Sequence, residues 1–228
     1  MATYLQLVQR VRQETGTAGT GPTTVESQKG QLAQLVSWVA QAYLDILNEW
    51  HDWKFLWAES TLDCVVGQPD YALQSNLRRI NEDAVYLTGG TLGVDKQPIG
   101  YIEYDQYRRN KGWHAGRGTP AHFTIKPDGK IKLLPAPDDT YTVEYEYWKT
   151  PTPLVGNTDN PLFDSVYDNA IVWRAVMYWA GFNEAEAEFQ KASFYFEQAK
   201  AALEAKFLPA MEQYHGRSEG IDIVVRPE

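Results

Sequence analysis

The sequence predicts an α+β protein: a helical bundle from the N- and C-terminal helices, with an inserted antiparallel β module and an extended C-terminal tail. Apolar residues recur at three- and four-residue steps near both ends of the 228-residue chain, which is the helical period. Between these ends, short β-type runs separated by turn residues replace that pattern. We expect N-terminal helices over 1–56, the β module over 57–150, a helical hairpin completing the bundle over 151–208, and the tail over 209–228.

Two helices are expected in the N-terminal segment. The first spans about Thr3 to Glu14, and the Gly- and Thr-rich stretch after it, residues 16–24, predicts a loop. The second begins at Glu26 or Lys29 and ends at Trp50. Its apolar residues form a wide stripe with helical period, and they are Leu32, Leu35, Val36, Val39, Tyr43, Ile46, Leu47 and Trp50.

The middle of the chain reads as short strands. The clearest hairpin turns at Pro127-Asp128-Gly129, because apolar and polar residues alternate on both sides of it. From Tyr141 to Trp148 aromatic or apolar residues alternate with polar ones, which is typical of a half-buried strand. The expected strands are Thr61–Val66, Ala84–Leu87, Ala121–Ile125, Lys130–Leu134 and Tyr141–Trp148.

The C-terminal segment returns to helix. Phe163–Gly181 is apolar on most sides and is expected at the centre of the bundle. Glu184–Phe207 follows after a compact turn, so the two helices should be antiparallel neighbours. Beyond Pro209, the short run Ile221–Val225 has β character and no sheet partner nearby in sequence.

Composition narrows the function. A formal net charge of −9 repels a phosphate backbone and an anionic membrane, so sequence-specific nucleic-acid binding and membrane partners are not expected. The single cysteine, Cys64, can form no internal disulfide, and the 4 histidines do not fall at metal-ligand spacing. No catalytic motif is present, so we expect a protein that is not an enzyme and uses no cofactor or metal. An enzyme site assembled from scattered acidic groups stays an alternative.

A basic and aromatic stretch allows two interpretations. Arginine and lysine alternating with aromatic rings could bind single-stranded nucleic acid, which would make the protein a nucleic-acid-binding accessory factor. The same residues could form a solvated loop or contact an acidic partner surface, and we favour that interpretation. Over residues 107–117 the stretch carries Arg108, Arg109, Lys111, Trp113 and Arg117.

The order of several local patterns carries a family resemblance. A helix ends in Trp-His-Asp-Trp-Lys-Phe-Leu at residues 50–56, and Tyr71-Ala72-Leu73 follows a Gly-Gln-Pro turn. Arg78-Arg79-Ile80 comes next, and then Ile-Lys-Leu-Leu-Pro-Ala-Pro-Asp at residues 131–138. The Tyr-rich strand, Asp-Asn-Pro-Leu-Phe at residues 159–163 and a long Ala- and Glu-rich helix close the pattern. Over about Leu32 to Phe207, the chain resembles the head-to-tail adaptor family of tailed bacteriophages, which includes the tail tubular A proteins of short-tailed phages.

The resemblance implies a structural protein of the virion at the head–tail junction, synthesised in the host cytoplasm. Members form rings, generally of twelve copies, beneath the portal. The expected partners are therefore further copies of this chain, the portal protein and the next tail or nozzle component. DNA would pass through the lumen without sequence-specific binding. Extended C-terminal segments in the family reach along neighbouring subunits or up to the portal, and residues 209–228 would correspond to them here.

Three groups of residues are hypothesised to serve assembly. The tail residues Tyr214, Ile221, Ile223 and Val225 would contact the portal or a neighbouring subunit. Alternatively, the run Ile221–Val225 folds back on its own β module or is disordered. The residues of the 107–117 stretch would contact a partner. Because segment 151–208 has the largest acidic excess, with 4 basic and 8 acidic residues, its glutamates would line the DNA channel: Glu184, Glu186, Glu188 and Glu197. The first three also suit a helix start, where carboxylates favour the helix dipole.

Overall fold

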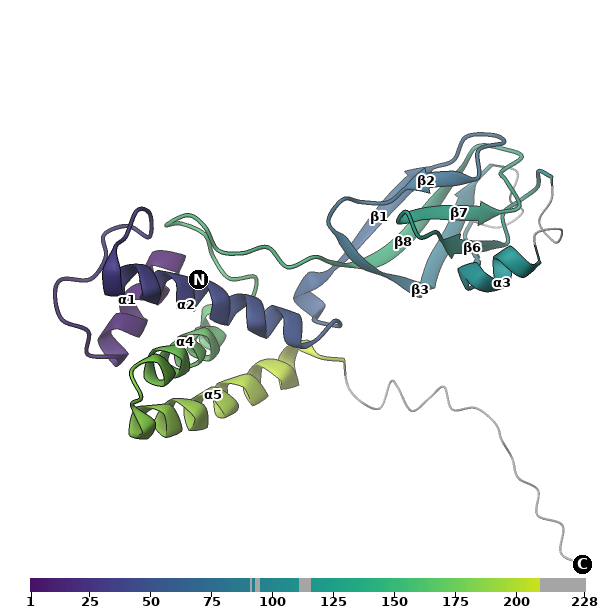
Figure 1. Ribbon diagram of the computed structural model, residues 1–228. Coiled ribbons are helices and arrows are strands. Elements are labelled where there is room, and N and C mark those ends of the chain that lie inside the picture. Colours follow the sequence, from purple (N-terminus) through teal and green to yellow (C-terminus); the bar gives the residue numbers. More distant parts are fainter. Residues whose placement is uncertain (91, 93–94, 111–115, 210–228) are drawn as a thin grey trace, which may run out of the picture. The chain divides into compact units, whose positions relative to one another are not determined.

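The computed structural model describes residues 1–90, 92, 95–110 and 116–209 (Figure 1). The chain divides into two compact units. The bundle unit consists of Met1–Phe55 together with the chain from Pro151 onward, and the β unit consists of Leu56–Thr150. The bundle unit is therefore built from two stretches that are far apart in sequence, whereas the β unit is one continuous stretch.

The bundle unit confirms the helices predicted at both ends of the chain. Its elements are α1 (Tyr4–Glu14), α2 (Gly30–Glu49), the 3-10 turn η3 (Ser165–Tyr167), α4 (Asp168–Phe182) and α5 (Glu186–Phe207). The predicted start of α4 at Phe163 is wrong by five residues, because Phe163 is a buried anchor ahead of the helix, 1% exposed. Helix α5 begins after Glu184, whose φ of 55° departs from helical backbone.

Helix α4 is central, as its composition predicts, and packs against α1, α2 and α5. Aromatic rings fill one end of this core. Phe163 lies 6.1 Å from Tyr43 and 5.5 Å from Phe55, measured between ring centroids. Trp53 stacks on Phe55 at 5.2 Å and donates its indole N–H to the Ile46 carbonyl at 3.1 Å. The buried indole thus has its one donor satisfied.

The β unit contains two four-stranded sheets, ordered β1-β8-β3-β4 and β2-β7-β6-β5. The chain enters it through the 3-10 turn η1 (Lys54–Leu56). The strands and one short helix are β1 (Trp57–Asp63), β2 (Asp70–Ala72), β3 (Leu77–Gly89), β4 (Gln97–Pro98), β5 (Gly100–Tyr101), α3 (Tyr104–Arg109), β6 (His122–Ile125), β7 (Lys130–Leu134) and β8 (Tyr141–Lys149). The predicted hairpin is the antiparallel β6–β7 pair.

The structure corrects several details of the predicted β module. Strand β1 starts four residues before the predicted Thr61, and β3 is far longer than Ala84–Leu87. Elements β2, β4, β5 and α3 were not predicted, because segments of two to six residues are too short to show a period. The module is also not wholly antiparallel, since β5 and β6 pair in parallel.

The core of the β unit lies on the inner face of β8, where the predicted alternation places Tyr141, Val143, Tyr145 and Tyr147. Phe123 of β6 is fully buried in the same cluster. Cys64 also belongs to this core. Its burial raises the pKa of the thiol to about 11, against opposition from a Tyr71 hydrogen bond, so the thiol is protonated at neutral pH.

Candidate assembly surfaces

The sheet β1-β8-β3-β4 presents a polar outer face, which we call the outer sheet face. The outer sheet face includes the β8 side chains that alternate with the core residues. It also includes every second side chain of β1. The two strands pair antiparallel without a register shift, so these side chains stand in ordered rows. They are Thr142, Glu144, Glu146 and Trp148 on β8, and Trp57, Glu59, Thr61 and Asp63 on β1.

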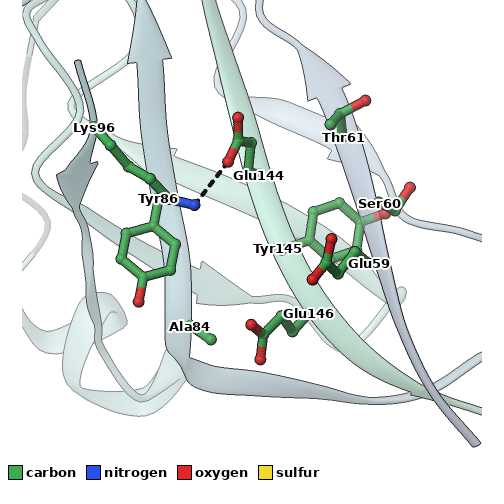
Figure 2. Close-up of a pocket in the computed structure, with 9 residues that line it drawn as sticks. All are labelled: Glu59, Ser60, Thr61, Ala84, Tyr86, Lys96, Glu144, Tyr145 and Glu146. Carbon is green, nitrogen blue, oxygen red and sulfur yellow. Dashed lines mark hydrogen bonds and ion pairs between the residues drawn. The ribbon is translucent and has the colours of Figure 1, made fainter.

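A shallow hollow of about 510 Å³ lies on this face (Figure 2). Glu144 accepts a hydrogen bond from Lys96 at 2.8 Å, and the Lys96 ammonium lies 4.2 Å from the centre of the Tyr86 ring. The hydrogen bond to Glu144 raises the pKa of Lys96, although burial opposes it. Figure 2 shows Glu59 and Glu146 on the adjoining strands of the same hollow. One lysine and three carboxylates therefore line the hollow.

Glu59 and Glu146 are direct cross-strand partners. Like charges placed opposite each other destabilise a sheet by about 0.2–1 kcal/mol. Asn81 donates a hydrogen bond to Glu146 at 3.1 Å, which satisfies one carboxylate oxygen without removing its charge. The outer sheet face is thus an acidic surface, suited to contact with basic side chains and unsuited to contact with phosphates.

Helices α2 and α5 of the bundle unit are joined by a charged cluster near their C-terminal ends. Lys200 pairs with Glu49 and lies 3.7 Å from Glu204, which accepts a hydrogen bond from the Trp50 indole at 2.7 Å. Burial lowers the pKa of Lys200, but the hydrogen bond to Glu49 and the charges of Glu49, Glu204 and Glu197 outweigh it and raise that pKa. The cluster links these two helix ends, and its side chains remain partly exposed to solvent.

The outer side of α5 carries exposed aromatic rings, which we call the α5 aromatic patch. Trp173 of α4 stacks on Tyr195 at 4.8 Å, and Phe194 lies 5.6 Å from Tyr195. The Lys191 ammonium lies 5.4 Å from the centre of the Trp173 ring. Phe194 is 61% exposed and Tyr195 40% exposed, so large apolar surface is left uncovered. Exposed aromatic clusters of this kind are typical of protein interfaces.

The four predicted channel glutamates are all exposed, but they do not share one face of a helix. Glu184 lies in the α4–α5 connection, and Glu186 and Glu188 lie in the first turn of α5. With about 100° of rotation per residue, Glu186 and Glu197 point in nearly the same direction, whereas Glu188 points roughly the opposite way. Glu186 accepts a hydrogen bond from Gln190 at 2.7 Å. The helix-start interpretation therefore suits Glu186 and Glu188 best.

The predicted partner-contact loop is only partly described. Arg108 and Arg109 form the last turn of α3, and Arg109 donates to the Asp105 carbonyl at 3.3 Å. Arg117 packs over Gly67, where a Cβ atom would lie 2.8 Å from the guanidinium carbon. Lys111 and Trp113 lie outside the described residues, as do the tail residues Tyr214, Ile221, Ile223 and Val225. Their proposed contacts therefore stay predictions.

Sequence reasoning missed the two best-defined surfaces. The alternation in β8 already placed its glutamates on the polar face, but only the pairing with β1 sets Glu59 against Glu146. Phe194 and Tyr195 fall off the apolar stripe of α5, and that departure was the available signal for an exposed patch. A partner helix, α4, supplies the third ring.

Among the described residues of the bundle unit, one acidic side chain is buried. Asp168, at the start of α4, is 1% exposed, and burial raises its pKa to about 6 against opposition from the Ala2 backbone N–H and the Arg10 guanidinium. Over the described residues, no group of three or more His, Cys, Asp or Glu side chains could hold a metal ion. In that same part of the chain, none of the helices has the length and apolar character needed to cross a membrane.

Residues 2–220 match the family described as SU10 adaptor protein. The chain belongs to this family of phage head–tail adaptor proteins. No curated protein matches it. Membership implies a structural role, a place in the virion and interaction with other phage head or tail proteins. The narrower likeness to the tail tubular A proteins remains a prediction.

Proposed function

We propose that the SU10 adaptor family member described above forms a ring between the portal and the tail of its phage and lets DNA pass through the lumen. The match of residues 2–220 to that family carries the proposal. The portal would bind one side of the ring and the next tail or nozzle component the other. Twelve copies are expected from the resemblance to head-to-tail adaptors.

A closed ring requires two different surfaces on each subunit that fit each other. The α5 aromatic patch and the outer sheet face are candidates for such surfaces. The first is apolar with one lysine, Lys191. The second is acidic and carries the exposed Trp57 ring, whose cross-strand partner Trp148 is half-buried. Burial of Phe194 and Tyr195 against a neighbour would remove the largest exposed rings of α5 from water.

The lumen must let DNA slide without gripping its phosphates. Negative side chains provide this by repulsion, and segment 151–208 carries 8 acidic against 4 basic residues. Glu186 and Glu197, which point the same way along α5, are better placed to line one wall together than Glu188 is. Glu184 adds a carboxylate at the α4–α5 turn.

Electron microscopy of the protein mixed with purified cognate portal rings tests the proposal. We expect a ring of density below the portal that is absent without this protein, and its symmetry gives the copy number. With the cognate portal in hand, the absence of added density contradicts the proposal. Salt-sensitive retention of single-stranded DNA by the same protein would then favour the nucleic-acid-binding alternative based on residues 107–117.

A matched pair of variants tests the subunit contact. Phe194→Asp places a charge in the α5 aromatic patch and should prevent ring formation on the portal, while Phe194→Tyr keeps the aromatic ring and should assemble normally. Because Phe194 is 61% exposed, neither variant should unfold the bundle unit, which circular dichroism would check. Normal rings from Phe194→Asp would exclude the patch from the interface.

Removal of residues 209–228 tests the tail. The truncated protein should keep the melting temperature of the full chain but fail to enter particles, because the predicted contacts of Tyr214, Ile221, Ile223 and Val225 would be lost. Incorporation at the level of the full chain would contradict a role of the tail in assembly.

A further inference from the structure

Strand β1 is an open edge of its sheet. The order β1-β8-β3-β4 places it at the end, where only β8 pairs with it. It is seven residues long, whereas the other three sheet ends are β2 with three residues and β4 and β5 with two each. Among the strands that the structure describes, β1 is therefore the longest unpaired edge.

The backbone groups directed to the open side of β1 can be identified from its pairing. The Cys64 N–H donates to the Tyr141 carbonyl at 2.7 Å, directly after β1. Along an antiparallel strand the residues bonded to one neighbour alternate with residues whose N–H and C=O point away. Since the β1–β8 register runs without a shift, the backbone groups of Glu59, Thr61 and Asp63 point to the open side.

The open side of β1 lacks the features that usually protect such an edge. Natural edges are blocked by proline, inward-pointing charges or bulges, and the sequence Trp-Ala-Glu-Ser-Thr-Leu-Asp has no proline or lysine. Its charged residues, Glu59 and Asp63, project onto the outer sheet face. On the inner face Ala58 and Leu62 pack against the core of the β unit but are only partly buried. An added strand could cover them.

The tail of the chain has the composition of such a strand. In Ile221-Asp222-Ile223-Val224-Val225-Arg226, the apolar residues Ile221, Ile223 and Val225 alternate with a set that ends in Arg226. If the apolar set extended the inner face, it would lie beside Ala58 and Leu62. Asp222 and Arg226 would then project on the outer sheet face, so a pairing that sets Arg226 rather than Asp222 beside Glu59 or Asp63 would be favoured.

We propose that β1 of one copy receives residues 221–225 of a second copy as an added strand. The inference rests on the proposed ring only in that the ring brings copies together. Phe207, at the end of α5, packs 5.2 Å from Phe55, which precedes β1 by two residues. A return of the tail to its own chain would need only a short connection. Residues 210–220 can instead extend to roughly 36 Å, which is longer than such a connection requires and suits a reach to another copy.

Two full-length variants are mixed, one that can only receive a strand on its β1 edge, called the acceptor, and one that can only supply the tail strand, called the donor. The acceptor is ¹⁵N-labelled and carries Ile223→Asp, which spoils the apolar face of its own tail. The donor is unlabelled and carries Thr61→Pro, which removes an N–H on the open side of β1 but no bond to β8, a placement in which an edge strand tolerates proline. Mixed together, only the donor tail and the acceptor edge can pair.

Amide hydrogen exchange of the labelled acceptor is the measurement. We expect exchange at Glu59, Thr61 or Asp63 to slow with donor concentration, by about tenfold when nine tenths of the acceptor is paired. The amides of Ser60 and Leu62 already bond to β8 and should not change. A donor carrying both Thr61→Pro and Ile223→Asp is the matched control and should have no effect.

Two outcomes overturn the proposal. One is unchanged exchange at all three open-side amides up to the solubility limit of the donor. The other is slow exchange of these amides in the unmodified chain at every dilution, which would mean that each tail pairs with its own β1. Thr61→Val, which keeps the N–H, should behave as the unmodified chain in both experiments.

The failure of this proposal is distinguishable from failure of the ring. If density still adds below the portal but the open-side amides exchange freely, the ring stands and the strand pairing is wrong. If the amides are protected by the donor while no density adds to the cognate portal, the pairing stands and the ring proposal is wrong.

Discussion

The bundle unit and the β unit build their cores from differently arranged parts of the chain. In the bundle unit, helices from both ends of the chain meet, and rings such as Tyr43 and Phe163 pack across 120 positions of sequence. The β unit is continuous, and the alternation of β8 places its residues on a core face and a solvent face. The bundle unit leaves aromatic rings exposed on α5, whereas the β unit leaves charges and a backbone edge exposed.

This difference indicates two ways of joining subunits. An apolar patch gains free energy when it is removed from water, and the screening of charges by salt does not weaken that gain. A charged face selects partners through charge, and that contribution falls as salt rises. An open strand edge selects partners through backbone hydrogen bonds. The bundle unit is therefore suited to supply affinity between neighbours, and the β unit to supply register and specificity.

The largest expected effect tests whether the two units unfold separately. Trp53→Ala removes a side chain that is 1% exposed and should destabilise the bundle unit by about 3–5 kcal/mol. In a calorimetric scan this should lower one transition and leave the other in place. Phe123→Ala, in the core of the β unit, is the matched variant and should lower the other transition. A single transition that both variants shift equally would show that the two units unfold together.

The second test uses pH and concerns the bundle unit alone. Asp168 has a folded pKa of about 6 against an ordinary value of 3.8, so between these values the folded state binds more protons than the unfolded state. The stability from this group is thus fully present below pH about 4 and is lost as pH rises through about 6, by an amount on the order of 3 kcal/mol.

Asp168→Asn should abolish this part of the pH dependence and be more stable than the unmodified chain at pH 7. Urea titrations at several pH values measure it, and the difference between the two proteins removes the contribution of other carboxyls. One of these is Asp159, whose pKa is lowered by the Gly156 and Val155 backbone N–H groups. A constant difference from pH 4 to pH 7 would contradict the assignment of the slope to Asp168.

A smaller effect is expected at the charged cluster of the bundle unit, where Lys200 pairs with Glu49 and Glu204. Lys200→Met keeps the aliphatic packing but leaves Glu49 and Glu204 without their shared cation. The loss should be about 1 kcal/mol and should shrink in high salt, because the pairs are partly exposed. Chemical denaturation at low and high salt measures it. A loss that does not respond to salt would indicate packing rather than charge.

The smallest effect has the opposite sign and concerns the β unit. Glu59→Lys replaces the like-charged pair with Glu146 by an opposite-charged one and should raise the stability of the β unit by about 0.5 kcal/mol at low salt. Glu59→Gln removes the repulsion alone and should give a smaller gain. A loss of stability in both variants would mean that Glu59 has a stabilising partner. If either variant impairs assembly despite its gain in stability, the acidic side chains of the outer sheet face take part in a contact with another subunit or partner.

The fold class, the helices at both ends and the half-buried strand β8 could be predicted from the amino-acid sequence. Each of these is a long segment with a clear period, so local burial alone specifies it. The same reasoning predicted that α4 is central, because a helix that is apolar on most sides has to be buried. It also placed Glu144 and Glu146 on the polar face of their strand.

Which residues share a surface could not be predicted from the sequence, because it depends on how distant segments pack. The short strands, the parallel β5–β6 pair and the start of β1 depend on pairing between segments distant in sequence, and no local period encodes that pairing. The same holds for Glu59 opposite Glu146, for Trp173 stacked on Tyr195 and for the open side of β1. A sequence specifies which face a side chain takes within its own element. The neighbour that it meets there is set by the packing of the whole unit.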